Sequence, residues 1–386
     1  MNRSDLEKIT ALRHELHAHP ALSGQEQGTM ARLMRFLREN TSLRIVEREG
    51  WFYAVREGHT PGIAFRADMD ALPIPEGADC PWPSQVPGVS HACGHDGHCA
   101  ALCGLALALD RAPADRQVYL IFQPAEETGA GGAACAKLLT EADIGEVYAF
   151  HNLGGFPEGA VVYRRGLTQP ASEGLSLRLQ GAASHAAEPE KGRNPAAALA
   201  ALTLYAAALP GTPHRGMTLC TVTGLRAGNG DFGISAGEGE LDLTLRAENE
   251  DDMRCMEAQL LERAGELAKR DGLTFNYAVS DYFPETRNHD AALDRVLAAA
   301  ERLRLACMEM KELWRASENF GHYLKACPGA IFYLGTGEDR PPLHTVGYDF
   351  NDWILPAAVD MLTALAGDAA AGRRAPAGNT RPGIEQ

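Results

Sequence analysis

Residues that could hold metal ions crowd into one short stretch, residues 91–98. It reads His-Ala-Cys-Gly-His-Asp-Gly-His, in a chain of 386 residues that has only 13 His and 9 Cys. Imidazole nitrogens and cysteine thiolates are ligands that transition metals prefer. Gly94 permits the sharp turn that would let Cys93 and His95 reach the same ions. The stretch therefore predicts metal binding by Cys93 and His95, with a weaker claim for His91 and His98.

Other reactive side chains follow apolar runs of the chain. The runs are residues 61–67, 117–122, 146–150 and 330–334, and the side chains that follow them are Asp68 and Asp70, Glu126 and Glu127, His151, and His344. A hydrolytic metal site needs one carboxylate as a ligand and another to take a proton from water, and adjacent glutamates can divide these tasks. Asp68 and Asp70 could be ligands, or acceptors that hold an imidazole in one tautomer; we favour acceptors.

These apolar runs predict the fold class. Buried strands that end in reactive polar residues are typical of an open α/β sheet, which places its site at the carboxyl ends of the strands. Helices are expected over residues 4–19, 25–40 and 99–110. Cys99 and Cys103 should be core thiols in the third helix. His14, His17 and His19, in or just after the first helix, are expected to be solvated or to cap it.

The middle of the chain has a different pattern of elements. Strands are expected at about 173–180, 217–224, 240–247 and 273–280, and helices at 194–209 and 251–270. This order, β-α-β-β-α-β, indicates a ferredoxin-like module. Because both flanking segments supply candidate site residues, the module should be an insertion. We therefore predict a discontinuous catalytic α/β domain (1–171 and 284–370), a lid and dimerisation domain (172–283), and a disordered tail (371–386).

Composition excludes several classes of protein. A net charge of −15 argues against nucleic-acid and anionic-membrane partners, which need a basic face. Apolar runs stay below the roughly 18 residues that span a bilayer, and the amino terminus has no signal-peptide core. Nine scattered Cys without a CxxC pair fit a reducing cytoplasm.

Competing motifs are weaker. No GxxxxGK[ST] phosphate loop is present, and the GxGxxG match at 228–233 and the GxSxG match at 233–237 fall between two predicted strands with no helix following. Cys93 could also be a cysteine nucleophile, but the neighbouring His and acids make a metal-bound thiolate the simpler interpretation.

Taken together, the chain resembles the aminoacylase and carboxypeptidase group of metallopeptidases, peptidase family M20. Within it the likeness is to amidohydrolases such as hippurate hydrolases and plant auxin-conjugate hydrolases. The matching segments are residues 13–20, 65–74, 91–98, 122–127, 151–153, 184–187 and 343–345. The resemblance implies two divalent ions per subunit, zinc or manganese with cobalt or nickel as further candidates. It also implies a smaller lid domain through which a homodimer often forms.

The resemblance assigns roles residue by residue. Glu126 would be the general base, and His185 in the lid would help to stabilise the oxyanion, in dimeric relatives from the partner subunit. The implied metal ligands are Cys93, His95, Glu127, His151 and His344.

Four departures from the family pattern concern the lid and the pocket. Glu190 stands where relatives carry His, Asn194 where they carry Asp before Pro, Gly233 where they carry Asn, and Asn319 where they carry Asp. The expected function is metal-dependent hydrolysis of an N-acyl amino acid or a related small amide. The alternatives are a dipeptidase of the same clan and a non-catalytic ligand-binding protein on this scaffold.

Overall fold

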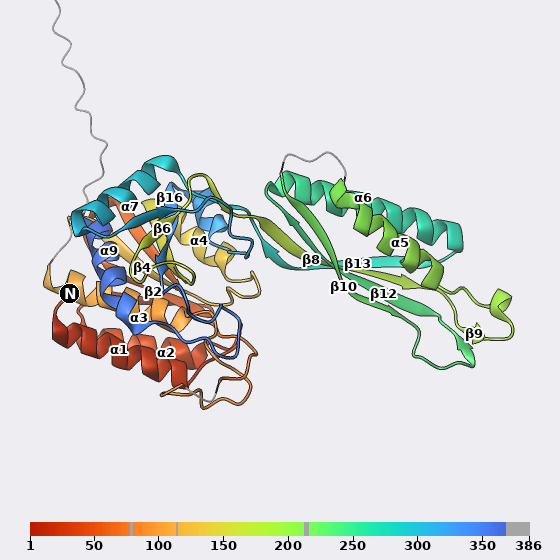
Figure 1. The fold of residues 1–386 in the computed structure, drawn as a ribbon, viewed down its shortest axis with the longest axis horizontal. Coiled ribbons are helices and arrows are strands. Elements are labelled where there is room, and N and C mark those ends of the chain that lie inside the picture. The colour runs from red at the N-terminus through yellow and green to blue at the C-terminus, as the bar shows by residue number, and fades with distance from the viewer. Residues whose placement is uncertain (78–79, 113–114, 212–215, 368–386) are drawn as a thin grey trace, which may run out of the picture.

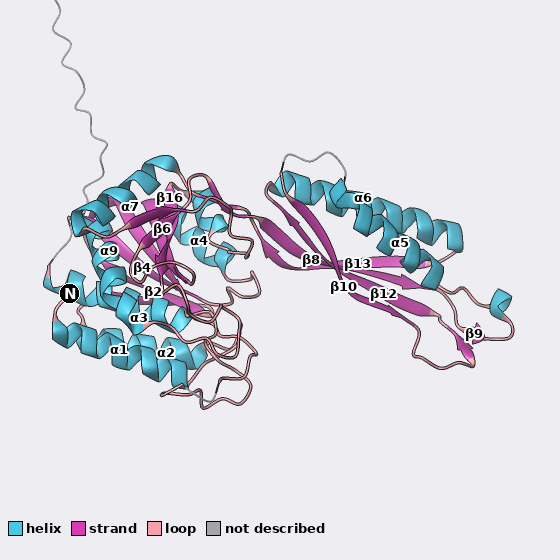
Figure 2. Cartoon of the chain, viewed as in Figure 1, coloured by secondary structure: helices cyan, strands magenta, loops and turns pink. Residues whose placement is uncertain are grey.

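An eight-stranded mixed sheet carries the strands that were predicted to deliver the site (Figures 1 and 2). The computed structural model describes residues 1–77, 80–112, 115–211 and 216–367. The predicted tail, 371–386, lies outside these residues. The strand order is β1-β2-β4-β3-β5-β16-β6-β15. The strands are β1 (Arg44–Arg48), β2 (Trp51–Arg56), β3 (His59–Asp68), β4 (Arg116–Gln123), β5 (Ile144–Leu153), β6 (Val161–Tyr163), β15 (Cys307–Glu309) and β16 (Gly329–Gly335).

The centre of this sheet is parallel. Strands β4, β3, β5 and β16 pair side by side in parallel, and the predicted strands at 61–67, 117–122, 146–150 and 330–334 lie within them. The pair β15–β6 is also parallel, whereas β1–β2, β2–β4 and β16–β6 are antiparallel. The predicted fold class, a mixed and mostly parallel sheet flanked by helices, is confirmed.

Side chains alternate between two apolar layers on opposite faces of the sheet. In β4, Val118, Leu120 and Phe122 join one core cluster, while Tyr119 and Ile121 join the other. The first layer contains α1 (Arg3–Ala18), α2 (Gln27–Asn40), α3 (His95–Arg111), α7 (Asp290–Leu303) and α9 (Leu355–Gly367). The second contains α4 (Gly132–Glu141) and α8 (Gly321–Ala326). Parallel strands buried on both faces explain the nearly continuous apolar runs of the sequence.

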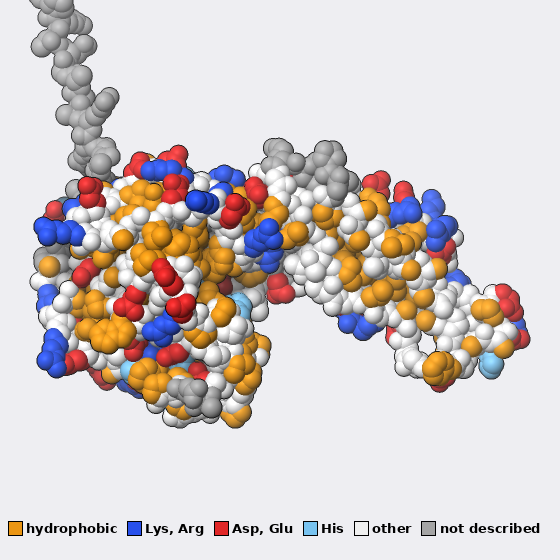
Figure 3. Space-filling view, in the orientation of Figure 1, with side chains coloured by type: hydrophobic (Ala, Val, Ile, Leu, Met, Phe, Trp, Pro, Cys, Tyr) orange, Lys and Arg blue, Asp and Glu red, His pale blue; other side chains and the backbone are white. Residues whose placement is uncertain are grey.

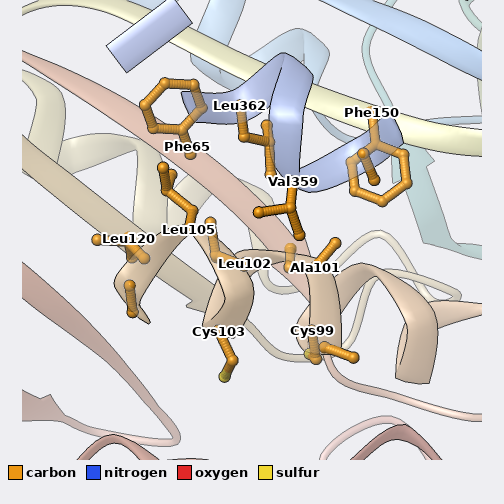
Figure 4. Close-up of a cluster of buried hydrophobic side chains, with 14 of the residues drawn as sticks. Phe65, Cys99, Ala101, Leu102, Cys103, Leu105, Leu120, Phe150, Val359 and Leu362 are labelled. Carbon is orange, nitrogen blue, oxygen red and sulfur yellow. The ribbon is translucent and has the colours of Figure 1, made fainter. Parts of the chain in front are cut away.

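Helix α3 packs on the sheet and against α9, and Cys99 and Cys103 belong to the apolar layer that these elements share (Figure 4). Both thiols are buried, as predicted. The helix begins at His95 and not near Cys99, so the second half of the metal-type stretch forms its first turns. Local packing permits this early start. A Cβ atom at position 97 would lie 2.3 Å from the Phe350 ring, so only a glycine there lets α3 run this close to the ring.

The predicted middle elements form a second, antiparallel sheet of order β10-β12-β8-β13. Its strands are β8 (Ala171–Gln180), β10 (Thr218–Ala227), β12 (Glu238–Ala247) and β13 (Thr274–Phe283). Helices α5 (Ala196–Ala208) and α6 (Glu250–Asp271) cover one face and share its core. This is the expected ferredoxin-like arrangement, called the second module below (171–283). The exact domain division of the sequence analysis stays a prediction.

Short elements complete the chain. They are β7 (Leu167–Gln169) paired with β14 (Thr286–Arg287), β9 (Ser184–His185) paired with β11 (Ile234–Ser235), and the 3-10 turns η1 (Pro189–Lys191), η2 (Leu209–Gly211) and η3 (Asp352–Ile354).

The second module extends to one side of the large sheet, with β9 at its far end (Figure 1). On the face drawn in Figure 3, basic and acidic side chains are interspersed and do not form one basic patch. Among the described helices, none has the length and apolar character needed to cross a membrane.

Candidate metal centre and active site

The predicted site residues converge at the carboxyl ends of the parallel strands. Strand β3 leads into Asp70, β4 leads into Glu126 and Glu127, and β5 carries His151. Because these strands are parallel neighbours, their ends meet at one edge of the sheet. The amino-terminal end of α3 brings Cys93 and His95 to the same edge.

Five side chains predicted as ligands lie within contact distance of one another. The Sγ atom of Cys93 is 3.4 Å from Nε2 of His151 and 3.4 Å from Nε2 of His344. Oε1 of Glu127 is 3.5 Å from Nε2 of His344 and 3.8 Å from Nε2 of His95. Their ligand atoms form overlapping groups of three, each group within 4.8 Å, which is close enough to surround ions.

Two histidines of this cluster have their tautomers fixed by backbone carbonyls. Nδ1 of His95 donates to the Asp70 carbonyl oxygen at 2.9 Å, and Nδ1 of His151 donates to that of Asn152 at 2.8 Å. Each ring therefore presents a lone pair on Nε2 toward the cluster, as metal-binding histidines do. Nε2 of His95 and Oε1 of Glu127 are buried without a hydrogen-bond partner in the described part of the chain. A metal ion would satisfy both atoms.

The pKa values of the acidic groups in the cluster are also consistent with a cation-binding site. Burial is the main cause that raises the pKa of Cys93 and Glu126 well above their ordinary values. Burial likewise raises the pKa of Glu127 to about 7. A divalent ion beside these groups would favour the thiolate and the carboxylates and so lower all three pKa values.

Asp70 and Asp68 lie behind the cluster. Oδ1 of Asp70 is 3.3 Å from Nδ1 of His95, and its Oδ2 accepts from the Glu127 backbone N–H at 2.9 Å. Asp68 accepts from Arg66 at 2.7 Å and contacts Nδ1 of His98 at 2.6 Å. These contacts are those of acceptors that orient neighbouring groups, the role favoured for both aspartates, and that role stays a prediction.

His98 and His91 have surroundings that differ from those of the five ligand candidates, although His98 lies beside His95 and Asp68. Both ring nitrogens of His98 are occupied by protein partners, Asp68 and Asn152, each at 2.6 Å. The His91 ring is buried 6.3 Å from the ring of His17, and burial lowers its pKa to about 4. The expectation that His17 is solvated or caps its helix is wrong: its side chain is fully buried between carboxylates.

Glu126 lies beside the cluster, but its side chain is held by a separate group of residues. Its Oε1 accepts from the Asn319 backbone N–H at 3.2 Å and lies 3.9 Å from Nη2 of Arg66. Arg66 is buried and also binds Glu318 at 2.9 Å and the Asn319 side chain at 2.8 Å. Burial, with added repulsion from Glu318 and Glu127, raises the pKa of Glu126, which favours a proton acceptor over a surface charge.

A cavity of about 400 Å³ opens onto this cluster. Besides the predicted residues, it is lined by Arg246 from β12, by Phe283 and by Trp314. The Trp314 ring meets the His151 ring edge-on at 5.3 Å. Sequence reasoning missed Arg246 and Trp314, since neither belongs to a motif. A slightly larger hollow, about 460 Å³, lies on the second module and contains none of the predicted residues.

His185 is the predicted residue that the chain does not bring to the cavity. It lies in β9, paired with Ile234, and is exposed at the far end of the second module (Figure 1). It is absent from the cavity lining. Within one chain, therefore, the cluster and His185 are separate.

Known proteins share this fold and about a quarter of the aligned residues. The model of peptidase family M20/M25/M40 matches residues 64–368. An N-acetylcysteine deacetylase of Bacillus subtilis is 27% identical, covering 93% of this chain and 96% of the relative. A hippurate hydrolase of Campylobacter jejuni is 27% identical, covering 94% and 96%. A Bacillus subtilis crystal structure, described as a dinuclear metal binding peptidase from the M20 family, has a TM-score of 0.77 at 25% identity and covers 95% of this chain and 98% of its own. The chain belongs to peptidase family M20/M25/M40.

Proposed function

We propose that the protein is a metal-dependent amidohydrolase that cleaves the amide bond of an N-acyl amino acid or a related small amide. The observation that carries this proposal is the convergence of five ligand-type side chains beside a buried, separately held Glu126. The names of the two curated relatives, a deacetylase and a hippurate hydrolase, support the substrate class.

Cys93, His95, Glu127, His151 and His344 would hold two divalent ions in each subunit. When bound, such ions acidify water and polarise a carbonyl group. The Cys93 thiolate favours a borderline metal such as zinc, while the imidazoles and carboxylate also suit manganese, cobalt or nickel.

Glu126 would act as the general base and then as the general acid. Its carboxylate would take the proton of the attacking water and pass it to the nitrogen of the leaving amine. The Asn319 N–H, 3.2 Å from Oε1, fixes the direction of the carboxylate for that transfer. Asp70 keeps His95 oriented through the Nδ1 contact, so that the reacting groups need no rearrangement.

Arg246 and the apolar wall would bind the two ends of the substrate. Strand β12 contributes the guanidinium of Arg246 to the cavity lining. This cation could form a salt bridge with the carboxylate of the amino-acid part of the substrate. Trp314 and Phe283 offer apolar surface for the acyl group.

His185 would stabilise the developing oxyanion from a second subunit of a homodimer formed through the second module. Its exposure and its distance from the cavity of its own chain support action between subunits. A cytoplasmic location is supported by nine free cysteines, none of them paired in a disulfide.

The test is hydrolysis by chelator-stripped protein reloaded separately with zinc, manganese or cobalt. We expect metal-restored cleavage of N-acyl amino acids. Preference for dipeptides would indicate a dipeptidase. Tight substrate binding with two ions per chain and no turnover would indicate a ligand-binding protein and contradict the proposal.

A further inference from the structure

Two basic side chains of helix α1, Arg13 and His17, are fully buried, and neither belongs to the proposed ligand set or to the general base. They are one helical turn apart and so point from the same face of α1. Buried cations of this kind are uncommon, and they need close acidic partners. Their partners come from three distant parts of the chain.

Arg13 joins two of these parts. Its Nη1 is 2.7 Å from Oδ1 of Asp349 and 3.4 Å from Oδ2 of Asp96. Its Nε and Nη2 bind the two carboxylate oxygens of Asp352 at 2.9 and 3.2 Å. The planar guanidinium is suited to such a fork, which a lysine could not reproduce.

His17 adds the third part. Nδ1 of His17 is 2.7 Å from Oδ2 of Asp96, and its Nε2 is 2.7 Å from Oε1 of Glu76. Asp96 is thus held by both cations of α1. Among the described residues, four carboxylates thus surround the two cations: those of Asp96, Glu76, Asp349 and Asp352. Other side chains also lie around them: Cys80 Sγ lies 3.7 Å from Nε2 of His17, the Trp82 ring lies under Arg13, and His14 contacts Asp352 at 2.7 Å.

The partners sit next to the proposed ligands. Asp96 directly follows His95 in the first turn of α3, and Asp349 lies in the segment that begins with His344. These two segments touch directly, because the His344 N–H donates to the Ala92 carbonyl at 2.8 Å. His344 itself has φ of 61°, a left-handed conformation that costs free energy in a residue with a Cβ and must be held by its surroundings.

We propose that Arg13 and His17 are positioning residues of the metal centre: by binding Asp96 and Asp349 together, they hold the segments of His95 and His344 at the spacing that the ions require. This inference rests on the ligand set proposed above. Without Arg13, the half-buried Asp349 carboxylate would lose its closest cation, and the buried Asp96 carboxylate would keep, among the described side chains, only His17 as a cationic partner. Repulsion between the two carboxylates would then push the two segments apart.

The test compares His17→Gln with His59→Gln, and Arg13→Lys with Arg35→Lys. His59 is exposed at the start of β3, and Arg35 forms an exposed pair with Glu15. Metal affinity is measured by competition with a chromophoric chelator, together with the visible spectrum of the cobalt-loaded protein. We expect about 10- to 100-fold weaker binding of at least one ion in the first variant of each pair, the usual effect of losing a partner behind a ligand. The controls should bind like the natural protein.

A purely structural network would behave differently. It would lower the melting temperature of the metal-free variants while leaving the affinity of the folded protein unchanged, and that result would overturn the inference. If Arg13→Lys does not fold, Asp349→Asn is compared with Asp294→Asn, whose carboxylate forms an exposed pair with Arg165 outside this network. A natural protein that binds two ions but hydrolyses nothing would contradict the proposed function and leave this inference intact.

Discussion

At the scale of single residues, a substitution of Glu126 can test proton transfer without removing a proposed metal ligand. Replacing it with glutamine keeps the shape of the side chain and an oxygen for the Asn319 N–H, but glutamine cannot accept a proton. We therefore expect Glu126→Gln to lower kcat by about 10²- to 10⁴-fold, the usual size of a general-base contribution. Metal content, measured by atomic emission, should stay at the natural level. Undiminished kcat would remove Glu126 from the mechanism.

The residue scale also shows what sequence reasoning can reach. Cys93, His95, Glu127, His151 and His344 could be named because each belongs to a motif or follows an apolar run. His17 lies in a segment that matches the family, but its burial could not be recognised, since its partners Asp96 and Glu76 are remote in sequence. Arg246 was missed for a related reason: an arginine in an alternating strand looks solvated until β12 is placed beside the cavity.

At the scale of elements, the start of α3 decides whether the cluster can form. Gly94 has φ of 92°, and a Cβ there would lie 2.5 Å from Oδ1 of Asn152 and 2.6 Å from Oη of Tyr348. Those two groups are hydrogen-bonded to each other, and Asn152 also holds His98. The turn between Cys93 and His95 therefore has no room for a side chain.

Gly94→Ala should consequently lose both stability and metal. Strain at such a position costs about 1–3 kcal/mol, and the clash with Asn152 adds to it. Urea unfolding and metal content together measure the effect. Gly24→Ala is the matched control, because Gly24 has φ of 79° but nothing within 4 Å of its Cβ position. We expect the control to lose stability and keep its metal. Equal metal content in both variants would show that the Gly94 turn does not shape the cluster.

Helices and strands could be predicted from the sequence where their burial produces a clear run of apolar residues. Strands β3, β4, β5 and β16 are buried on both faces, so their apolar runs stand out. The first turns of α3 were not predicted as helix, because glycine and histidine are weak helix formers. Packing against Phe350 decides that segment, and Phe350 is more than 250 positions away in the chain.

At the scale of the whole molecule, the proposed role of His185 requires a route by which it reaches the metal-ligand cluster. The motif at residues 184–187 can be recognised in the sequence, but it does not tell whether His185 acts in the active site of its own chain or in that of a partner. In the structure, β9 is at the far end of the second module. If His185 acts at the cluster, as proposed, either a partner subunit or a large movement of the module has to bring it there. The two routes make opposite predictions for a mixture of inactive variants.

Mixing Glu126→Gln with His185→Ala tests these routes directly. If His185 acts between subunits, a mixed dimer has one site that combines an intact Glu126 with an intact His185 of the other chain. Random reassociation of equal amounts, after mild denaturation and refolding, should then restore about a quarter of the natural activity, because half of the dimers are mixed and each has one working site. If His185 serves its own chain, every site in the mixture lacks one group and activity stays at the level of the separate variants. Analytical ultracentrifugation of the same samples ties the result to assembly, since restored activity requires a dimer, and a monomeric protein with full activity would reject action between subunits.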